Sequence, residues 1–366
     1  MVFAGGGSGG HLYPGIAVAQ SLQEVDPSVE VIFCCTTKSI DENILQGKNW
    51  DWFCQPVTPV PSRPWRLPRF YFAWRNSLRV CRDLIEEENV GVILGLGGYA
   101  SGPALKVASQ RQIPAAMLNP DALPGRTNRY ASKFCEKIFV QFPSTTECFK
   151  AGPKKCLVTG CPIRKGILES DRSAASTKLR LDRRKQNLLI MGGSLGGRNL
   201  NYAVLSCLTN HISRDLLQNW QIFHITGNSD HHAIMSGYEK AGVLVQTFPY
   251  YEEMADLLAI SDLAICRAGA STLSELTAGG IPSILLPYPY HRDKHQLRNA
   301  EALSDQGAAR IVIDAKNREV TAGNLADDLQ KSLSDPQLRK RMQEASKRQA
   351  RPNASLQIAE ELLKMV

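Results

Sequence analysis

Glycine, serine and histidine stand together near the start of the chain, in the run GGGSGGH at residues 5–11. Glycine is favoured where the backbone turns sharply or comes close to a ligand, and the free N–H groups at a helix N-terminus attract anions. The run therefore predicts a phosphate-binding turn between a strand and a helix. His11 ends the run and can exchange a proton near neutral pH, which makes it a candidate base. It could instead hold an acceptor phosphate or cap the helix.

Two more glycine loops of this kind follow, LGLGGYASGP at 94–103 and MGGSLGGRN at 191–199. The first loop also fits the dinucleotide-binding pattern G-x-G-x-x-G, which expects an acidic residue at the end of the next strand to hold a ribose. That strand is expected to end in CCTT at 34–37, which disfavours a redox dinucleotide. No loop has the Gly-Lys-Ser/Thr ending of a Walker A motif. Each could also be no more than a tight turn.

The most specific local pattern is CRAGASTLSE at 266–275. Ser271 and Thr272 stand where side-chain oxygens can cap the start of a helix. Glu275 lies one turn further along. It can cap the same helix, or it can accept hydrogen bonds from both hydroxyls of a ribose, because an ionised carboxylate only accepts.

Strand-like and helix-like segments alternate along the chain, which predicts parallel sheets covered by helices. The length of 366 residues is too great for one ordinary core. We therefore expect an α/β fold with two Rossmann-like domains facing a cleft. The first domain is placed at 1–162, the second at 163–340, and a C-terminal helix at 341–366 that packs back toward the first domain. The polar run 169–187 is expected to belong to a linker.

Composition narrows the class of protein further. No apolar run reaches the roughly 18–20 residues of a membrane span. The 10 cysteines include no Cys-x-x-Cys pair, and most lie in apolar runs, so we expect free thiols in a reducing, cytoplasmic compartment.

Taken in order, these motifs resemble the MurG family of UDP-N-acetylglucosamine transferases. The matching stretches lie between Ala4 and Ala308 and are GGGSGGHLYPGIAVA, GLGGYASGP, PGRTN, TGCPIR, MGGSLGGRNLN, CRAGASTLSE and HQLRNA. The resemblance implies a glycosyltransferase B-type fold with an acceptor- and membrane-side first domain and a UDP-sugar-binding second domain. It also implies transfer of N-acetylglucosamine, with inversion, from UDP-GlcNAc to the 4-hydroxyl of a muramoyl-pentapeptide sugar on undecaprenyl diphosphate. UDP-GlcNAc is then a substrate of peptidoglycan precursor synthesis, and no cofactor is expected.

The resemblance also assigns roles to individual residues. On the acceptor side, Tyr99 would position the acceptor beside His11. On the donor side, Glu275 would hold the ribose, Ser194 would meet the diphosphate, and Tyr251 would lie at the uracil. The other donor contacts implied are Ser8, Gly9, Gly10, Asp121, Arg164, Ala270, Ser271, Thr272, Leu273, Ser274 and Gln296.

An inverting transfer needs a base for the attacking hydroxyl and stabilisation of the departing UDP. The sequence has no Asp-x-Asp motif, and we expect no metal ligands. Helix N-termini at the third loop and at Ser271-Thr272, aided by an arginine, are expected to carry the charge instead.

One segment departs from the family. Residues 118–121 are Leu-Asn-Pro-Asp, where the family normally has His-Glu-Gln-Asn. Asp121 thus takes the place of an asparagine linked to donor binding. This change leaves the identity of the acceptor undetermined. The alternatives are a related transferase with another lipid or sugar acceptor, or a UDP-sugar-binding protein that has lost catalysis.

Six arginines interleave with aromatic residues in PSRPWRLPRFYFAWRNSLRVCRDL at 61–84. Basic residues around an apolar patch suit contact with anionic lipid, which predicts peripheral binding at the cytoplasmic face of the inner membrane. A buried amphipathic helix with a solvated basic face is the alternative, and no motif supports nucleic acid. The predicted membrane patch is Trp65, Arg66, Arg69, Phe70, Phe72, Trp74 and Arg75.

Overall fold

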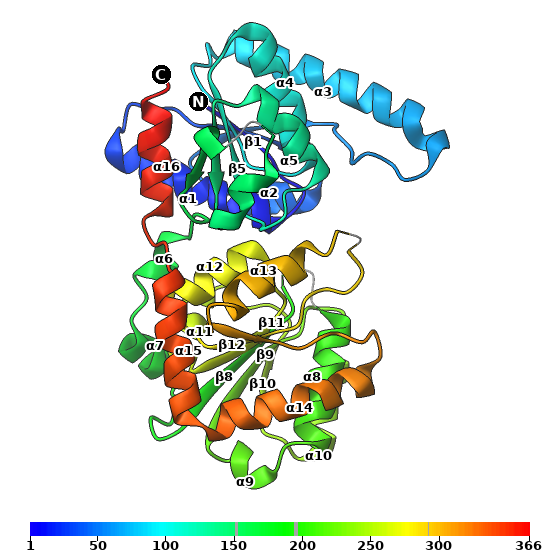
Figure 1. Cartoon of the computed structure of the whole chain (residues 1–366), viewed down its shortest axis with the longest axis vertical. Coiled ribbons are helices and arrows are strands. Elements are labelled where there is room, and N and C mark those ends of the chain that lie inside the picture. Colours follow the sequence, from blue (N-terminus) through cyan, green and yellow to red (C-terminus); the bar gives the residue numbers. More distant parts are fainter. Residues whose placement is uncertain (151–152, 194–196, 292) are drawn as a thin grey trace. The chain divides into compact units, whose positions relative to one another are not determined.

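The computed structural model describes residues 1–150, 153–193, 197–291 and 293–366. Contacts divide the chain into two compact units, shown in Figure 1. The first unit contains Met1–Arg164 together with Pro352–Val366, and the second contains Lys165–Arg351. The first unit thus ends at Arg164, where the sequence suggests 162. The chain returns to it at Pro352, where the sequence suggests 341.

The first unit is built on one parallel sheet in the order β3-β2-β1-β4-β5-β6-β7. Residue Ala4 at the end of β1 pairs with Cys34 of β2 and with Gly95 of β4, so the segments that follow these three strands leave the sheet side by side. The strands are β1 (Val2–Ala4), β2 (Ile32–Thr36), β3 (Asp51–Gln55), β4 (Ile93–Gly95), β5 (Ala115–Asn119), β6 (Lys137–Val140) and β7 (Cys156–Val158).

Helices cover this sheet and bury its apolar residues in two clusters. The longest, α3, extends well beyond the sheet in Figure 1. The last helix of the chain, α16, packs beside α1, and Lys137 Nζ on β6 lies 2.6 Å from a Glu361 carboxylate oxygen on α16. The helices are α1 (Gly9–Val25), α2 (Ser39–Leu45), α3 (Leu67–Glu87), α4 (Gly102–Arg111), α5 (Arg126–Ala131) and α16 (Ala354–Leu363), with short 3-10 turns that include η1 (Pro64–Arg66) and η2 (Tyr99–Ser101).

The second unit has a parallel sheet in the order β10-β9-β8-β11-β12-β13. Its strands are β8 (Gln186–Met191), β9 (Trp220–Ile225), β10 (Gln246–Phe248), β11 (Leu263–Cys266), β12 (Ser283–Leu285) and β13 (Ala309–Ile311). Its helices are α6 (Lys165–Leu168), α7 (Arg172–Lys178), α8 (Arg198–Asn210), α9 (Arg214–Leu217), α10 (His231–Ala241), α11 (Met254–Ile260), α12 (Ala270–Ala278), α13 (His295–Ser304), α14 (Arg318–Ser334) and α15 (Pro336–Gln349). Each unit is therefore an α/β layer structure of Rossmann type.

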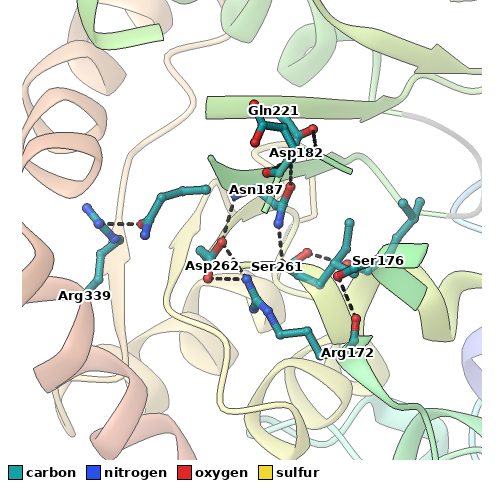
Figure 2. Close-up of polar contacts among 11 residues, drawn as sticks. Arg172, Ser176, Asp182, Asn187, Gln221, Ser261, Asp262 and Arg339 are labelled. Carbon is teal, nitrogen blue, oxygen red and sulfur yellow. Dashed lines mark hydrogen bonds and ion pairs between the residues drawn. The ribbon is translucent and has the colours of Figure 1, made fainter. Parts of the chain in front are cut away.

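The polar run expected to be a linker is packed against the second unit instead (Figure 2). Arg172 on α7 donates to Asp262 at 2.8 Å, and the same carboxylate accepts from the backbone N–H of Asn187 at 2.8 Å. The backbone N–H of Asp182 donates to Gln221 at 2.9 Å. The prediction of a linker through 169–187 is thus wrong. Polar groups of this run have partners in the second unit, at the end of the sheet where β8 begins.

Candidate active site

The first glycine loop is held in place by a buried carboxylate. The N–H of Gly7 lies 2.7 and 2.8 Å from the two oxygens of Asp41, which also accepts from the N–H and hydroxyl of Thr36 at the end of β2. Gly6 and Gly7 have φ of +150° and +83°, which favours glycine. The Gly7 amide is therefore committed to Asp41, and a phosphate at this loop has to use other amides.

His11 lies in the first turn of α1, against the second glycine loop. Its Nδ1 is 2.9 Å from Ser8 Oγ, and a Cβ placed on Gly98 would be 3.0 Å from its Nε2. Burial lowers the pKa of His11 below its ordinary value, and Lys38 adds to this, while the charges of Asp121 and Asp41 oppose it. The imidazole is therefore neutral near pH 7, the state in which it can accept a proton.

Tyr99 joins the first and second loops. A Cβ on Gly7 would be 2.8 Å from the Tyr99 hydroxyl oxygen. Lys38 Nζ lies 5.7 Å from the centre of the Tyr99 ring and donates to the Gly7 carbonyl at 3.3 Å. His11, Tyr99 and Lys38 thus come together at the carboxyl ends of β1, β2 and β4.

The Leu-Asn-Pro-Asp segment at residues 118–121 is linked to the second glycine loop by hydrogen bonds. Asn128 accepts from the N–H of Gly98 at 3.1 Å and donates to Asn119 at 2.8 Å. Asn119 is buried and donates in turn to the backbone carbonyl of Asp121 at 2.8 Å. Through this chain, the residues that follow β5 support the loop that contacts His11.

Besides Asp121, four predicted donor residues lie in this unit. Ser8 occupies the N-cap position of α1, and its hydroxyl engages His11 rather than the helix amides. Gly9 is buried and Gly10 exposed at the start of the same helix. The guanidinium of Arg164 lies over the ring of Tyr13 on α1, with 4.8 Å between its carbon and the ring centre.

In the second unit, the predicted donor residues gather along α12. Gly269 is the N-cap, and Ala270, Leu273 and Ser274 are buried on the inner side of the helix. Ser271, Thr272 and Glu275 are half-buried. Ser271 and Glu275 are four residues apart and therefore share one face of the helix.

A buried ion pair, which sequence reasoning missed, supports the start of α12. Arg267 lies 2.9 Å from Asp314, and both side chains are less than a tenth exposed. The same guanidinium donates to the carbonyl of Leu286 at 2.9 Å, while Asp314 accepts from Asn199 on α8. The pair thus joins the segments that follow β11, β12 and β13 to the first turn of α8. Arg267 stands in the CRAGA motif, but nothing in the sequence indicates its partner, which lies 47 residues later.

The remaining predicted donor contacts lie on other elements of the chain. Gln296 on α13 accepts from the backbone N–H of Tyr288 at 2.9 Å. Tyr251 packs edge-on against Phe248, with 5.0 Å between ring centres, and burial raises the pKa of its hydroxyl. Ser194 lies outside the described residues.

The predicted membrane patch divides into two parts. Trp65 and Phe72 are 71% and 64% exposed, and the three arginines Arg66, Arg69 and Arg75 are exposed beside them. Phe70 and Trp74 instead stack on each other, with 6.2 Å between ring centres, and Trp74 lies over Gly102 at the start of α4. Trp74 therefore anchors α3 to the unit. Among the described residues, no helix is both long and apolar enough to span a bilayer.

Comparisons with known proteins cover nearly the whole chain. The family models described as the glycosyltransferase family 28 N-terminal and C-terminal domains match residues 1–140 and 187–358. A relative from Geobacter sulfurreducens is 34% identical over 99% of this chain and 98% of its own. One from Desulforamulus reducens is 32% identical over 96% and 95%. Both are named UDP-N-acetylglucosamine–N-acetylmuramyl-(pentapeptide) pyrophosphoryl-undecaprenol N-acetylglucosamine transferase. The chain belongs to the MurG family of glycosyltransferases.

The solved structures agree with this membership. The crystal structure of Acinetobacter baumannii MurG matches with a TM-score of 0.76 and 26% identity, over 99% of this chain and 98% of its own. A UDP-GlcNAc 2-epimerase from Neisseria meningitidis matches with a TM-score of 0.69 at 15% identity, which shows the fold alone. Because the glycosyltransferase B-type fold is shared with epimerases, the fold by itself does not decide the reaction.

Proposed function

We propose that this MurG-family chain transfers N-acetylglucosamine from UDP-GlcNAc to the 4-hydroxyl of a muramoyl-pentapeptide sugar on undecaprenyl diphosphate. The observation that carries the proposal is the full-length similarity to relatives named for that transfer. The transfer inverts the anomeric centre, because one hydroxyl displaces UDP directly.

His11 is proposed as the base that takes the proton of the attacking hydroxyl. Its neutral state, its place at the meeting of two glycine loops and its contact with Ser8 support this role. When Ser8 Oγ accepts from Nδ1–H, the lone pair of the ring is on Nε2 and can receive the proton. The carboxylates of Asp41 and Asp121 favour the imidazolium that results, and Tyr99 is proposed to position the acceptor.

On the donor side, α12 is proposed to hold the nucleotide. Glu275 accepts from the ribose hydroxyls, and the amides at the start of α12 face the diphosphate, where helix N-terminal groups stabilise negative charge. The remaining contacts proposed are Ser8, Gly9, Gly10, Asp121, Arg164, Ser194, Tyr251, Ala270, Ser271, Thr272, Leu273, Ser274 and Gln296. Donor binding by these groups needs no metal ion, so EDTA is expected to leave the affinity for UDP unchanged. A lower affinity in EDTA would contradict this.

The exposed part of the α3 patch is proposed to bind the cytoplasmic face of the membrane. Trp65 and Phe72 can enter the interface while Arg66, Arg69 and Arg75 meet anionic headgroups. The wild-type chain is therefore expected to sediment with anionic vesicles at low salt and less at high salt. Changing Trp65 and Phe72 to serine should abolish this, whereas the same change at Tyr250, an exposed aromatic of the second unit, should not. Equal sedimentation with uncharged vesicles would argue against the patch.

A related transferase with another acceptor is the second candidate. The observation that favours it is the charge of Asp121, which acts on His11 from the segment that differs from the family pattern. The deciding experiment measures transfer of labelled GlcNAc to a muramoyl-pentapeptide diphospho-lipid analogue, together with UDP binding. Product supports the proposal. UDP binding without product supports another acceptor, or a binding protein without catalysis, and a screen of alternative lipid and sugar acceptors then separates these two.

A further inference from the structure

Two histidines and an aspartate come together just before and at the start of α13. His291, Asp293 and His295 each offer one ligand atom, and these atoms all lie within 4.8 Å of one another. His291 and His295 are four residues apart, a spacing that the sequence-based expectation of no metal ligands overlooked. No other such group occurs among the described residues.

The nitrogen atoms of the two histidines face each other. His291 Nδ1 lies 3.0 Å from His295 Nε2, and the two rings stack with 4.3 Å between their centres. Two nitrogens bound to one tetrahedral zinc ion, at about 2.0–2.1 Å each, are about 3.3 Å apart. The pair therefore has nearly the spacing that a shared metal ion requires.

Asp293 fixes which nitrogen of His295 can bind a metal ion. Its carboxylate accepts from His295 Nδ1 at 2.8 Å, which leaves the lone pair on Nε2, the atom that faces His291. A carboxylate that orients a histidine through its other ring nitrogen is the usual support of a metal-binding imidazole. The ring of His291 is supported in turn by Tyr288, with 4.8 Å between ring centres.

We propose that His291 and His295, oriented by Asp293, bind a transition-metal ion of the class that prefers imidazole, such as Zn²⁺, Co²⁺ or Ni²⁺. Mg²⁺ and Ca²⁺ prefer oxygen ligands and are not expected to compete. Before binding, His291 carries its proton on Nδ1 and donates it to His295 Nε2. When the metal ion binds, His291 is protonated on Nε2 instead of Nδ1, so both rings stay neutral. The site does not depend on the proposed transfer reaction, because none of its ligands takes part in that reaction.

The site is tested by titrating the purified, metal-free full chain with Co²⁺ and following its visible absorption, with Zn²⁺ as competitor. We expect His291→Ala and His295→Ala each to lower the affinity at least about tenfold, and Asp293→Asn to lower it by about 10–100-fold. His211→Ala removes an exposed histidine elsewhere in the second unit and should change nothing. His291→Gln repeats the test in a chain that keeps a hydrogen-bonding side chain at this position. Equal Co²⁺ affinity in the wild type and the His291 variants, or displacement of Co²⁺ by equimolar Mg²⁺, would overturn the proposal.

Discussion

The imidazole of His11 lies against Gly98, where a Cβ would come within 3.0 Å of both Nε2 and Cε1. Gly98 has φ of +71°, a conformation that side chains rarely adopt. The second glycine loop thus packs against the ring of His11. This close approach requires glycine at position 98. The proposed base is therefore held between two loops that follow neighbouring strands.

Changing His11 to alanine is expected to lower kcat by at least about 10²-fold, the usual contribution of a positioned base, and to leave UDP affinity nearly unchanged. UDP affinity is measured by calorimetry and turnover by release of UDP. Ser8→Ala keeps the imidazole and removes only its 2.9 Å contact, so its loss should be smaller. Full activity in the alanine variant would remove His11 from the mechanism.

Asp121 partly offsets the effect of burial on the pKa of His11. Its charge raises the pKa of His11, while burial, the larger effect, lowers it. Asp121→Asn removes the opposing charge, so the pKa of His11 falls further. We expect the acid limb of the pH profile of kcat/KM to move to lower pH. Asp121→Glu keeps the charge and should keep the profile. A shift to higher pH in the asparagine variant would show that the limb reports another group.

The alternation of strands and helices is predictable from the sequence because buried parallel strands are apolar throughout. The edge strand β3 lacks this apolar signal, because Asp51, Phe53 and Cys54 are exposed in it. The glycine loops were recognisable as turns, and the strand order explains why the first two meet.

The polar partners of these loops were not predictable from the sequence. Asp41 stands on the short helix α2, and only the packing of α2 beside the first loop brings its carboxylate to Gly7. Asp314 follows β13 and lies 2.9 Å from Arg267, which follows β11, two strands away in the sheet. Such contacts join residues that are distant in the chain, so no local spacing records them.

Glu275 is predicted to recognise the ribose. Glu275→Ala should weaken UDP binding by about 1.5–3 kcal/mol, the range for hydrogen bonds to a charged group. UDP that lacks both ribose hydroxyls should bind the wild type and the variant alike, and calorimetry of the four pairs forms a double-mutant cycle. If Glu275 only caps α12, the variant loses the same affinity for both ligands.

The Arg267–Asp314 pair is predicted to stabilise the second unit. Asp314→Ala leaves the Arg267 guanidinium buried without its carboxylate, which is expected to cost about 3–5 kcal/mol of unfolding free energy. Urea unfolding measures this. Arg298→Ala breaks an exposed pair with Glu301 and should leave stability nearly unchanged. A loss for Asp314→Ala as small as that for Arg298→Ala would mean that the buried pair contributes little.

His224 is predicted to make the second unit sensitive to acid. It is fully buried between the Tyr238 hydroxyl at 3.0 Å and Asn201 at 3.2 Å, and burial lowers its pKa from 6.5 to about 3. Below pH 6.5 the unfolded chain therefore binds a proton that the folded unit does not. The stability of the unit should fall as the pH falls from 6.5 toward 3, by at most about 1.4 kcal/mol per pH unit from this group.

The contribution of His224 can be separated from that of other groups by comparing unfolding free energies at pH 8 and pH 5. His224→Gln is expected to be less stable than the wild type at pH 8, because the buried hydrogen bonds are disturbed, but to lose less stability between the two pH values. His211→Gln, at an exposed position, should lose as much as the wild type. Burial of His11 acts in the same direction and is present in all three proteins, so it cancels in the comparison. An equal loss in the His224 variant and the wild type would show that His224 is not the acid-sensitive group.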